Sequence, residues 1–368
     1  MKQIKKVSIN QPIMGSMEEE IKSLIKVCLS IFASLCYTYF IASKIPKGKL
    51  RLLSLLPIFY LFTTLPLSLS TALPAGVFAM FITWVGSFKL LLFSFGHGPL
   101  SSDPPLNSLL LFIFTACLPI KTSQKLFPNL ERTPKLPLNL PTKILLFGIL
   151  VALTDYKKHL HPRILLGQYC CMLYLFVDVL VGVANATMRA VLGIELESPS
   201  NEPYLSTSLQ DFWGRRWNLM ITNTLRQTVH KPVRSAAETF LGTAWAPLPA
   251  VLATFLVSGL MHELIYFYMT RATPTWEVTW FFVLHGVCLV VEFGVKKALG
   301  GRWRLHWVVS TALTIVFVVA TATWLFFPPL VRNGVDTRAI EECKELVEFV
   351  KQKLKWDQFS WPIISLGH

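Results

Sequence analysis

The sequence predicts an all-α protein, a polytopic bundle of transmembrane helices. Of its 368 residues, 53% are hydrophobic and 15% are charged, whereas soluble domains carry roughly 25% charged residues. The apolar residues also form uninterrupted runs as long as the roughly 20 residues that a helix needs to cross a bilayer. Lys and Arg gather in the short segments between these runs. We therefore expect a membrane-embedded protein with no independent soluble domain.

The lengths of the apolar runs predict about eight spans or near-spans. Seven runs are long enough for a helical span, at residues 24–42, 52–69, 72–95, 164–191, 248–269, 276–295 and 307–330. Two further runs, at 107–119 and 144–153, are too short for a simple span. We expect them to be tilted, re-entrant or buried against other helices.

We divide the chain into three parts. Residues 1–16 are polar and basic, and Met17 opens an acidic stretch just before the first run. We expect 1–16 to be a dispensable extension, with Met17 as an alternative start. Residues 17–330 form the membrane-embedded domain. Residues 331–368 form a charged tail whose apolar side chains follow a helical period, and we expect it to lie on the membrane surface or to pack on the body.

Net charge and cysteine usage exclude two other classes of protein. The net charge is +14, which in a soluble protein would indicate nucleic acid. Here the positive residues lie in loops, as they do where loops meet anionic lipid, and we expect membrane lipid rather than nucleic acid as the partner. The seven cysteines include no CxxC pair, so neither a disulfide framework nor a zinc site is predicted.

The first candidate site residue is His262, in the apolar stretch SGLMHELIY at 258–266. An ionisable residue in a span is costly and is functional by default. On a helix, Ser258 and Tyr266 share the face of His262, whereas Glu263 points about 100° away. A neutral imidazole there is suited to general base catalysis. The alternative is a structural histidine bonded to a neighbouring helix, and His285, in another apolar run, is the competing candidate.

A second motif, SLQDFWGRRWNLM at 208–220, lies in the longest polar stretch between spans. Ser208 is a good N-cap, and we expect one helix to follow it. On that helix Asp211, Arg215 and Asn218 would share a polar face, and Trp213, Trp217 and Met220 an aromatic face. The alternative is an interfacial anchor helix, which would not explain the amide of Asn218.

Basic residues in and after this motif suit a substrate that carries phosphates. Arg215 and Arg216 are adjacent, and Arg226, Lys231 and Arg234 follow downstream. Such side chains bind the phosphates of a nucleotide-tailed substrate. Neither a serine-hydrolase elbow, nor a Walker loop, nor an HExxH motif, nor a glycine-rich dinucleotide fingerprint is present in the sequence.

Together, SLQDFWGRRWN and the later SGLMHELIY resemble the membrane-bound O-acyltransferases, and in particular the plant wax synthase branch. Two earlier segments add to this resemblance, LCYTYFIASKIPKGKLRLLSLLPIFY and FKLLLFSFGHGPLSSDPPLNSLLLFIFTACLPIK, so that it extends from about Met17 to Pro329. The resemblance implies a helical bundle around a reaction chamber inside the membrane. It also matches His262 to the family's catalytic histidine and Asn218 to its partner asparagine. Where the wider family often has two Trp before that Asn, this chain has Arg216 and Trp217.

The resemblance implies transfer of a fatty acyl group from acyl-CoA, as co-substrate, to a long-chain fatty alcohol, which yields a wax ester and CoA. No metal and no other cofactor is implied. An integral multi-pass protein of the endoplasmic reticulum membrane is expected. Besides catalytic His262 and Asn218, we predict as substrate-binding residues Asp211, Trp213, Arg215, Arg216, Trp217, Ser258 and Tyr266.

Two other functions stay open at this point. A sterol is also an apolar acceptor with one hydroxyl, so the same chemistry would make sterol esters. In a membrane transporter, His262 would instead be a proton relay. The polar motif at 208–220 favours acyl transfer, because transport does not need it.

Overall fold

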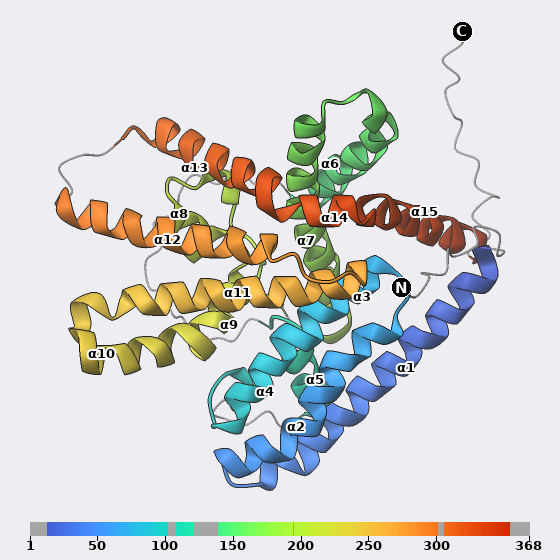
Figure 1. Ribbon diagram of the computed structural model, residues 1–368. Helices are drawn as coiled ribbons and strands as arrows, with labels where there is room; N and C mark the ends of the chain where they lie inside the picture. The colour runs from blue at the N-terminus through green and yellow to red at the C-terminus, as the bar shows by residue number, and fades with distance from the viewer. Residues whose placement is uncertain (1–12, 102–107, 121–138, 194, 301–304, 354–368) are drawn as a thin grey trace, which may run out of the picture.

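The computed structural model is all-helical, as the sequence predicts (Figure 1). It describes residues 13–101, 108–120, 139–193, 195–300 and 305–353. The N-terminal helices are α1 (Ile13–Phe40), α2 (Lys49–Thr64), α3 (Ala72–Phe78), the π-helix η3 (Ala79–Gly86), α4 (Ser87–Ser94), α5 (Leu109–Cys117), α6 (Leu140–Leu153) and α7 (Pro162–Leu192). They are followed by α8 (Leu209–Asp211), the π-helix η7 (Phe212–Arg216), α9 (Leu219–Leu225), the π-helix η8 (Arg226–His230) and α10 (Lys231–Trp245). The C-terminal helices are α11 (Pro247–Thr270), α12 (Glu277–Ala298), α13 (Trp307–Thr321), the π-helix η9 (Ala322–Phe326), α14 (Pro328–Arg332) and α15 (Val335–Lys353).

Seven helical segments among the described residues are long and apolar enough to cross a membrane. They coincide with the seven long apolar runs of the sequence, at Glu18–Lys44, Lys49–Ser68, Ala72–Ser94, Pro162–Leu192, Pro247–Thr270, Glu277–Ala298 and Trp307–Arg332. The expected total of about eight included near-spans; the described part of the chain contains seven candidate spans and the two shorter helices α5 and α6. The protein is a multi-pass membrane protein.

The two short apolar runs form helices that do not span. Helix α5 has 9 residues and α6 has 14, which at 1.5 Å per residue makes them about 14 Å and 21 Å long, against about 30 Å of hydrocarbon. Helix α5 packs against α1 and buries Phe112. Helix α6 lies along α7 (Figure 1), where Gln168 donates to the carbonyl of Leu150 at 2.8 Å.

Helices α9 to α10 continue one another through η8, over residues 219–245, and lie alongside α11 (Figure 1). This segment falls in the stretch that the sequence marked only as polar. Its residues Arg226, His230, Lys231 and Arg234 keep its mean hydropathy too low for an apolar-run criterion. It nevertheless packs on a membrane span, and it supplies one side of the functional site.

The core consists of three clusters of buried apolar side chains. The first joins α1 to α5, for example Leu35, Leu55 and Phe62. The second joins α7, α11 and α12 with η9 and includes Phe282. The third connects Trp84 and Val85 of η3 with Met220, Ile221 and Leu225 of α9. The candidate site lies where the second and third clusters meet.

Helices α11 and α12 run side by side (Figure 1) because small and polar residues join them. A Cβ atom on Gly259 would lie 3.0 Å from the Cα of Thr279, so glycine permits this close approach. The carboxylate of Glu263 accepts from the backbone amide of Thr279 at 3.2 Å, in the first turn of α12. Glu263 therefore ties the two helices together and, as expected, does not orient the ring of His262.

Large apolar side chains cover the outer surface of the spans. Leu29, Tyr60 and Val316 are exposed, and Phe240 on α10 is 88% exposed. Such a surface would aggregate in water but suits the hydrocarbon of a bilayer.

Most of the described part of the C-terminal tail is the helix α15, which packs on the body of the protein. The carboxylate of Glu342 accepts from the amides of Ala72 and Leu73 at 2.6 and 2.8 Å, at the N-terminus of α3. Arg338 donates to the carbonyl of Met269 at 2.8 Å. Of the two placements expected for the tail, these contacts correspond to packing on the body; residues 354–368 lie outside the described residues.

The N-terminal extension proposed at 1–16 lies mostly outside the described residues. Helix α1 begins at Ile13 and continues through Met17 into the first span, so the last four residues of the extension are helical. The dispensability of 1–16 stays a prediction.

Candidate active site

His262 lies in the middle of α11, and its ring is held in one orientation. Nδ1 lies 2.7 Å from the carbonyl oxygen of Ser258, one turn earlier. A carbonyl oxygen only accepts, so Nδ1 carries the proton in the neutral ring and Nε2 keeps its lone pair. Phe282 stacks on the imidazole with ring centres 4.3 Å apart, and Trp84 meets it edge-on at 5.1 Å. The free position of the ring is thus a basic nitrogen.

Asn218 lies at a sharp break between two helical segments. Trp217 is extended, and Asn218 adopts the left-handed conformation with φ 41° and ψ 61°; we refer to these two residues as the helix break. Asn tolerates this conformation better than most residues, although it still costs on the order of 1 kcal/mol. The side-chain oxygen of Asn218 accepts from the amide of Ile221 at 3.3 Å and caps α9. This bond fixes the side chain and leaves the NH₂ group as its donor.

The prediction of one continuous helix from Ser208 to Met220 is wrong. Ser208 is the predicted N-cap, since its hydroxyl accepts from the amide of Asp211 at 3.1 Å. The chain then enters a π-helical turn, in which the amide of Trp217 donates to the carbonyl of Phe212, five residues earlier, at 2.8 Å. The extra residue in this turn shifts the register, and the break follows at once. Consequently Asp211, Arg215 and Asn218 share no helix face.

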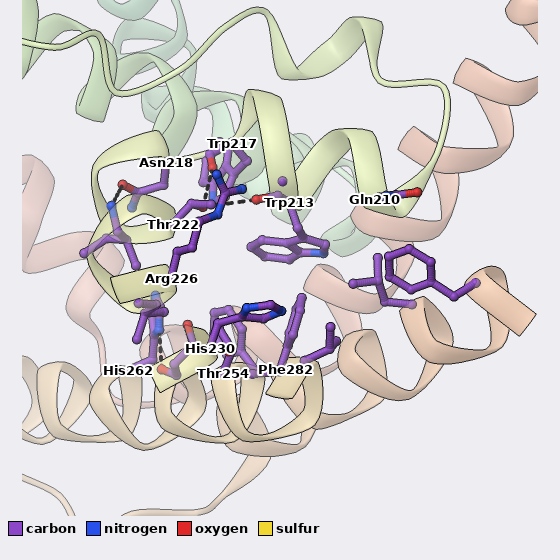
Figure 2. A pocket seen from close by; sticks show the side chains of 18 residues that line it. Gln210, Trp213, Trp217, Asn218, Thr222, Arg226, His230, Thr254, His262 and Phe282 are labelled. Atoms are coloured by element: carbon purple, nitrogen blue, oxygen red, sulfur yellow. Dashed lines mark hydrogen bonds between the residues drawn. The ribbon is translucent and has the colours of Figure 1, made fainter. Parts of the chain in front are cut away.

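His262 and Asn218 line the same cavity, which has a volume of about 260 Å³ (Figure 2). Asn218 enters from the start of α9 and His262 from α11, the helix packed beside it. The two residues, 44 positions apart in the chain, thus lie in the wall of one cavity. The full lining is Gln210, Trp213, Gly214, Trp217, Asn218, Ile221, Thr222, Leu225, Arg226, His230, Val251, Thr254, Phe255, Ser258, His262, Phe282, Leu289 and Phe293.

The remaining lining divides by chemistry into an apolar set and a polar set. Val251, Phe255, Leu289 and Phe293 come from α11 and α12 and suit an aliphatic chain. The polar set is Gln210, Thr222, Arg226, His230 and Thr254.

His230 contributes a second imidazole to the cavity. Burial lowers the pKa of His230, and the charges of Arg226 and Arg234 lower it further, so its ring is neutral at pH 7. Arg226 is therefore the cation in this part of the lining. A phosphate group bound here would contact its guanidinium and the neutral imidazole of His230.

Three of the seven predicted substrate-binding residues line the cavity. Trp213 and Trp217 do so from η7 and the helix break, and Ser258 does so from α11. Ser258 is buried, and its carbonyl also holds the ring of His262.

The other four predicted substrate-binding residues lie outside this lining. Asp211 accepts from Nε of Arg216 at 2.7 Å, an ion pair that stays within the protein. Arg215, on the same turn, is exposed. Tyr266 is buried and donates its hydroxyl to the carbonyl of Phe326 at 2.8 Å. Asp211 thus forms its ion pair inside the protein and does not contribute to a polar face toward a substrate. The reason is that the π-helical turn points Asp211 toward Arg216 instead of Arg215.

His285, the competing histidine, is fully buried and uses both ring nitrogens inside the protein. Nδ1 accepts from the indole N–H of Trp213 at 2.9 Å. That bond requires an unprotonated Nδ1, so Nε2 donates to the hydroxyl of Thr321 at 2.8 Å. His285 is therefore a structural histidine that joins η7, α12 and α13. His97, His159 and His161 are exposed.

Sequence reasoning missed several residues of the site. His230 and Gln210 had not been singled out, although His230 follows Arg226 by four positions and hence shares its helix face. Trp84 packs on His262 from η3, and its buried indole N–H has no hydrogen-bond partner among the described residues. Nothing in the sequence near Trp84 indicates this contact, since 178 residues separate it from His262.

The site lies within a region that has a known sequence signature. A sequence model described as "Membrane bound O-acyl transferase family" matches residues 197–284, which include both Asn218 and His262. Over 341 residues the chain is 45% identical to the probable long-chain-alcohol O-fatty-acyltransferase 1 of Arabidopsis thaliana, covering 91% of this chain and 98% of the relative. The chain belongs to the membrane-bound O-acyltransferase family.

Two further relatives of this membrane-bound O-acyltransferase extend the comparison. The long-chain-alcohol O-fatty-acyltransferase of Simmondsia chinensis is 43% identical, over 92% of this chain and 97% of its own length. An acyl-CoA–sterol O-acyltransferase of Arabidopsis thaliana is 40% identical, over 90% and 98%. Because these alignments cover nearly the whole of each chain, the similarity extends over the spans as well as the site.

Proposed function

We propose that this protein is a wax synthase, an enzyme that transfers a fatty acyl group from acyl-CoA to the hydroxyl of a long-chain fatty alcohol. Support comes from its relatives, most of which are named for this reaction. The main structural support for the mechanism is the bond from Nδ1 of His262 to the carbonyl of Ser258. It leaves Nε2 as a base in a cavity that also contains Asn218.

In the proposed reaction, His262 is the general base. Nε2 takes the proton of the alcohol hydroxyl while the alcohol oxygen attacks the carbonyl carbon of the thioester. The tetrahedral intermediate collapses as the C–S bond breaks, and the imidazolium returns the proton to the sulfur of CoA. The ester and free CoA leave, and the enzyme is regenerated with no covalent intermediate. A positioned base of this kind contributes about 10²- to 10⁴-fold to the rate.

Asn218 stabilises the negative charge that develops on the thioester oxygen. Its cap to Ile221 uses the side-chain oxygen, so the NH₂ group is the part that donates to the oxyanion. Loss of one such donor costs about 3–4 kcal/mol of transition-state stabilisation. The cap thus holds the NH₂ group in position before substrate binds. Stabilisation of an oxyanion depends on donors that are preorganised in this way.

The lining suggests how the two substrates are placed. Arg226, beside neutral His230, binds the phosphates of the acyl-CoA. The aliphatic chains lie against the apolar residues of α11 and α12, among them Phe255 and Leu289. These walls form the apolar part of the reaction chamber.

Sterol ester synthesis is the second candidate, because one relative is named as an acyl-CoA–sterol O-acyltransferase. The same base and donor would serve a sterol hydroxyl. A transporter, the third function that the sequence left open, is not proposed, since the relatives are named as acyltransferases. We further propose residence in the endoplasmic reticulum membrane, which co-localisation of the tagged protein with a marker of that membrane tests.

The function is tested by expression in a host that lacks its own neutral-lipid acyltransferases. Microsomes receive labelled acyl-CoA with fatty alcohol, sterol or diacylglycerol, and the labelled ester is identified. We expect wax ester from fatty alcohol. Sterol ester alone would assign the second candidate, and no ester from any acceptor would contradict the proposal.

A further inference from the structure

Asp178 is an acid inside the span formed by α7, and the mechanism above makes no use of it. Its side chain is 3% exposed, and both of its oxygens are occupied. Oδ2 accepts from Nζ of Lys143 on α6 at 2.5 Å, and Oδ1 accepts from the hydroxyl of Ser200 at 2.6 Å. The lysine compensates the buried charge. Ser200 belongs to no helix, so its bond to Asp178 does not pack one helix against another and must have a different role.

Ser200 lies in a segment, residues 199–201, that is bonded to the backbone on both sides of the helix break. The amide of Leu219 donates to the carbonyl of Pro199 at 2.8 Å. The amide of Asn201 donates to the carbonyl of Arg216, also at 2.8 Å. Ser200 is the residue between these two bonds, and its own bond to Asp178 connects the segment to α7.

The helix break depends on such external bonds. A non-glycine residue in the left-handed conformation persists only where its surroundings hold it. The bonds of Leu219 and Asn201 hold the backbone directly after and before the break, and the ring of Tyr174, one turn from Asp178 on α7, packs on Trp217 with centres 6.4 Å apart. One contiguous set of contacts therefore leads from α7 to Asn218.

We propose that Asp178 is a positioning residue for Asn218. The intramembrane carboxylate anchors Ser200, the segment 199–201 holds the helix break, and the break aims the NH₂ group of Asn218 into the cavity. The ion pair with Lys143 compensates the charge of this carboxylate, and a hydrogen bond to a charged acceptor is stronger than one between neutral groups. The inference rests on the proposed function, in which Asn218 acts on the transition state rather than on substrate binding.

Kinetics of the full-length protein in microsomes test this role. Asp178→Ala should lower kcat about 10- to 100-fold, as small misplacements of a catalytic group do, and leave KM for both substrates within about twofold. Ser200→Ala should act in the same direction with a smaller factor. In an Asn218→Ala background, Asp178→Ala should have no further effect, because the residue through which it acts is gone. The same fall in both backgrounds would overturn the proposal.

Asp155→Ala is the matched control. Asp155 also pairs with a lysine, Lys344 at 2.8 Å, but it lies in the short 3-10 helix Thr154–His159 and its side chain is 60% exposed. We expect kcat to be unchanged, because exposed ion pairs contribute little.

Hydrogen–deuterium exchange in detergent gives a readout that does not need activity. In Asp178→Ala and Ser200→Ala, peptides covering 197–206 and 214–221 should take up deuterium faster, while the spans and Asp155→Ala stay as in the wild type. If Asp178→Ala fails to insert, Ser200→Ala, which removes a single hydroxyl, decides the question. Unchanged exchange at 214–221 would overturn the proposal. Wild-type microsomes that make no ester would instead count against the proposed function alone.

Discussion

Trp213 donates its indole N–H to Nδ1 of His285 over 2.9 Å, and this bond fixes one side of the cavity to α12. The ring of Trp213 meets Phe255 edge-on at 5.5 Å and contacts Phe282 at 5.6 Å. Phe282 in turn stacks on His262 at 4.3 Å. A buried histidine that takes no part in the reaction thus orders both the substrate-facing tryptophan and the packing of the base.

The bond between Trp213 and His285 predicts different results for two neutral substitutions of the histidine. His285→Asn places a carbonyl oxygen near the former Nδ1 and keeps an acceptor for Trp213. His285→Gln extends past that position and leaves the buried indole N–H unpaired, a loss of about 1–3 kcal/mol. We expect near wild-type kinetics for His285→Asn, and for His285→Gln a several-fold higher KM for the alcohol with broader chain-length selectivity. Equal behaviour of the two variants would contradict this role.

Gly286 controls where Phe255 stands in the cavity. A Cβ atom at Gly286 would lie 2.9 Å from the Cβ of Phe255, so Gly286→Ala pushes that ring aside. We expect a lower rate with long chains and a shift of preference toward shorter ones, read by supplying alcohols and acyl-CoAs of graded length. Gly294→Ala is the control on the same helix, because a Cβ there meets nothing within 4 Å. The same chain-length profile in both variants would show that Gly286 has no such effect.

The basic residues of the cavity predict a test of donor binding. Arg226→Gln should raise KM for acyl-CoA about tenfold, since charge-assisted bonds contribute about 1.5–3 kcal/mol, and leave KM for the alcohol unchanged. Arg215→Gln serves as the control, because Arg215 is exposed outside the cavity lining. Steady-state kinetics with each substrate varied in turn measure both constants. A rise in KM for the alcohol alone would argue against phosphate binding by Arg226.

Glu263 predicts a loss of stability without a loss of chemistry. Its carboxylate caps the first turn of α12 through Thr279, and removal of such a cap costs about 1 kcal/mol. Glu263→Ala should therefore lower the Tm in detergent by several degrees. Glu263→Gln, which retains an acceptor oxygen, should keep most of the Tm and a kcat close to that of the wild type. A large fall in kcat for folded Glu263→Gln would assign the acid a part in the reaction.

Most of the fold could be predicted because membrane spans follow from local composition. An apolar run of about 20 residues has few alternatives in a bilayer, and each predicted span agrees with the structure to within six residues at either end. The helix 219–245 could not be predicted in this way. Thr222, Arg226 and His230 line the cavity beside α11, whereas Lys231 and Arg234 are exposed. This placement depends on a partner helix and not on the segment itself.

The site was predictable only in part, for a similar reason. His262 was identified because an ionisable group in hydrocarbon is costly, and Asn218 because an amide is unexpected in an anchor helix. The π-helical turn that separates Asp211 from Asn218 has no sequence signal that we recognise. The pairing of Trp213 with His285 links residues 72 positions apart, and neither residue's neighbourhood indicates the other.

In the proposed reaction, Nε2 of His262, with Nδ1 bonded to the carbonyl of Ser258, is the base of acyl transfer. The most direct measurement is single-turnover ester formation by His262→Ala in microsomes that contain as much inserted protein as the wild type. We expect the rate to fall about 10²- to 10⁴-fold. Ester formation by His262→Ala at the wild-type rate would contradict it.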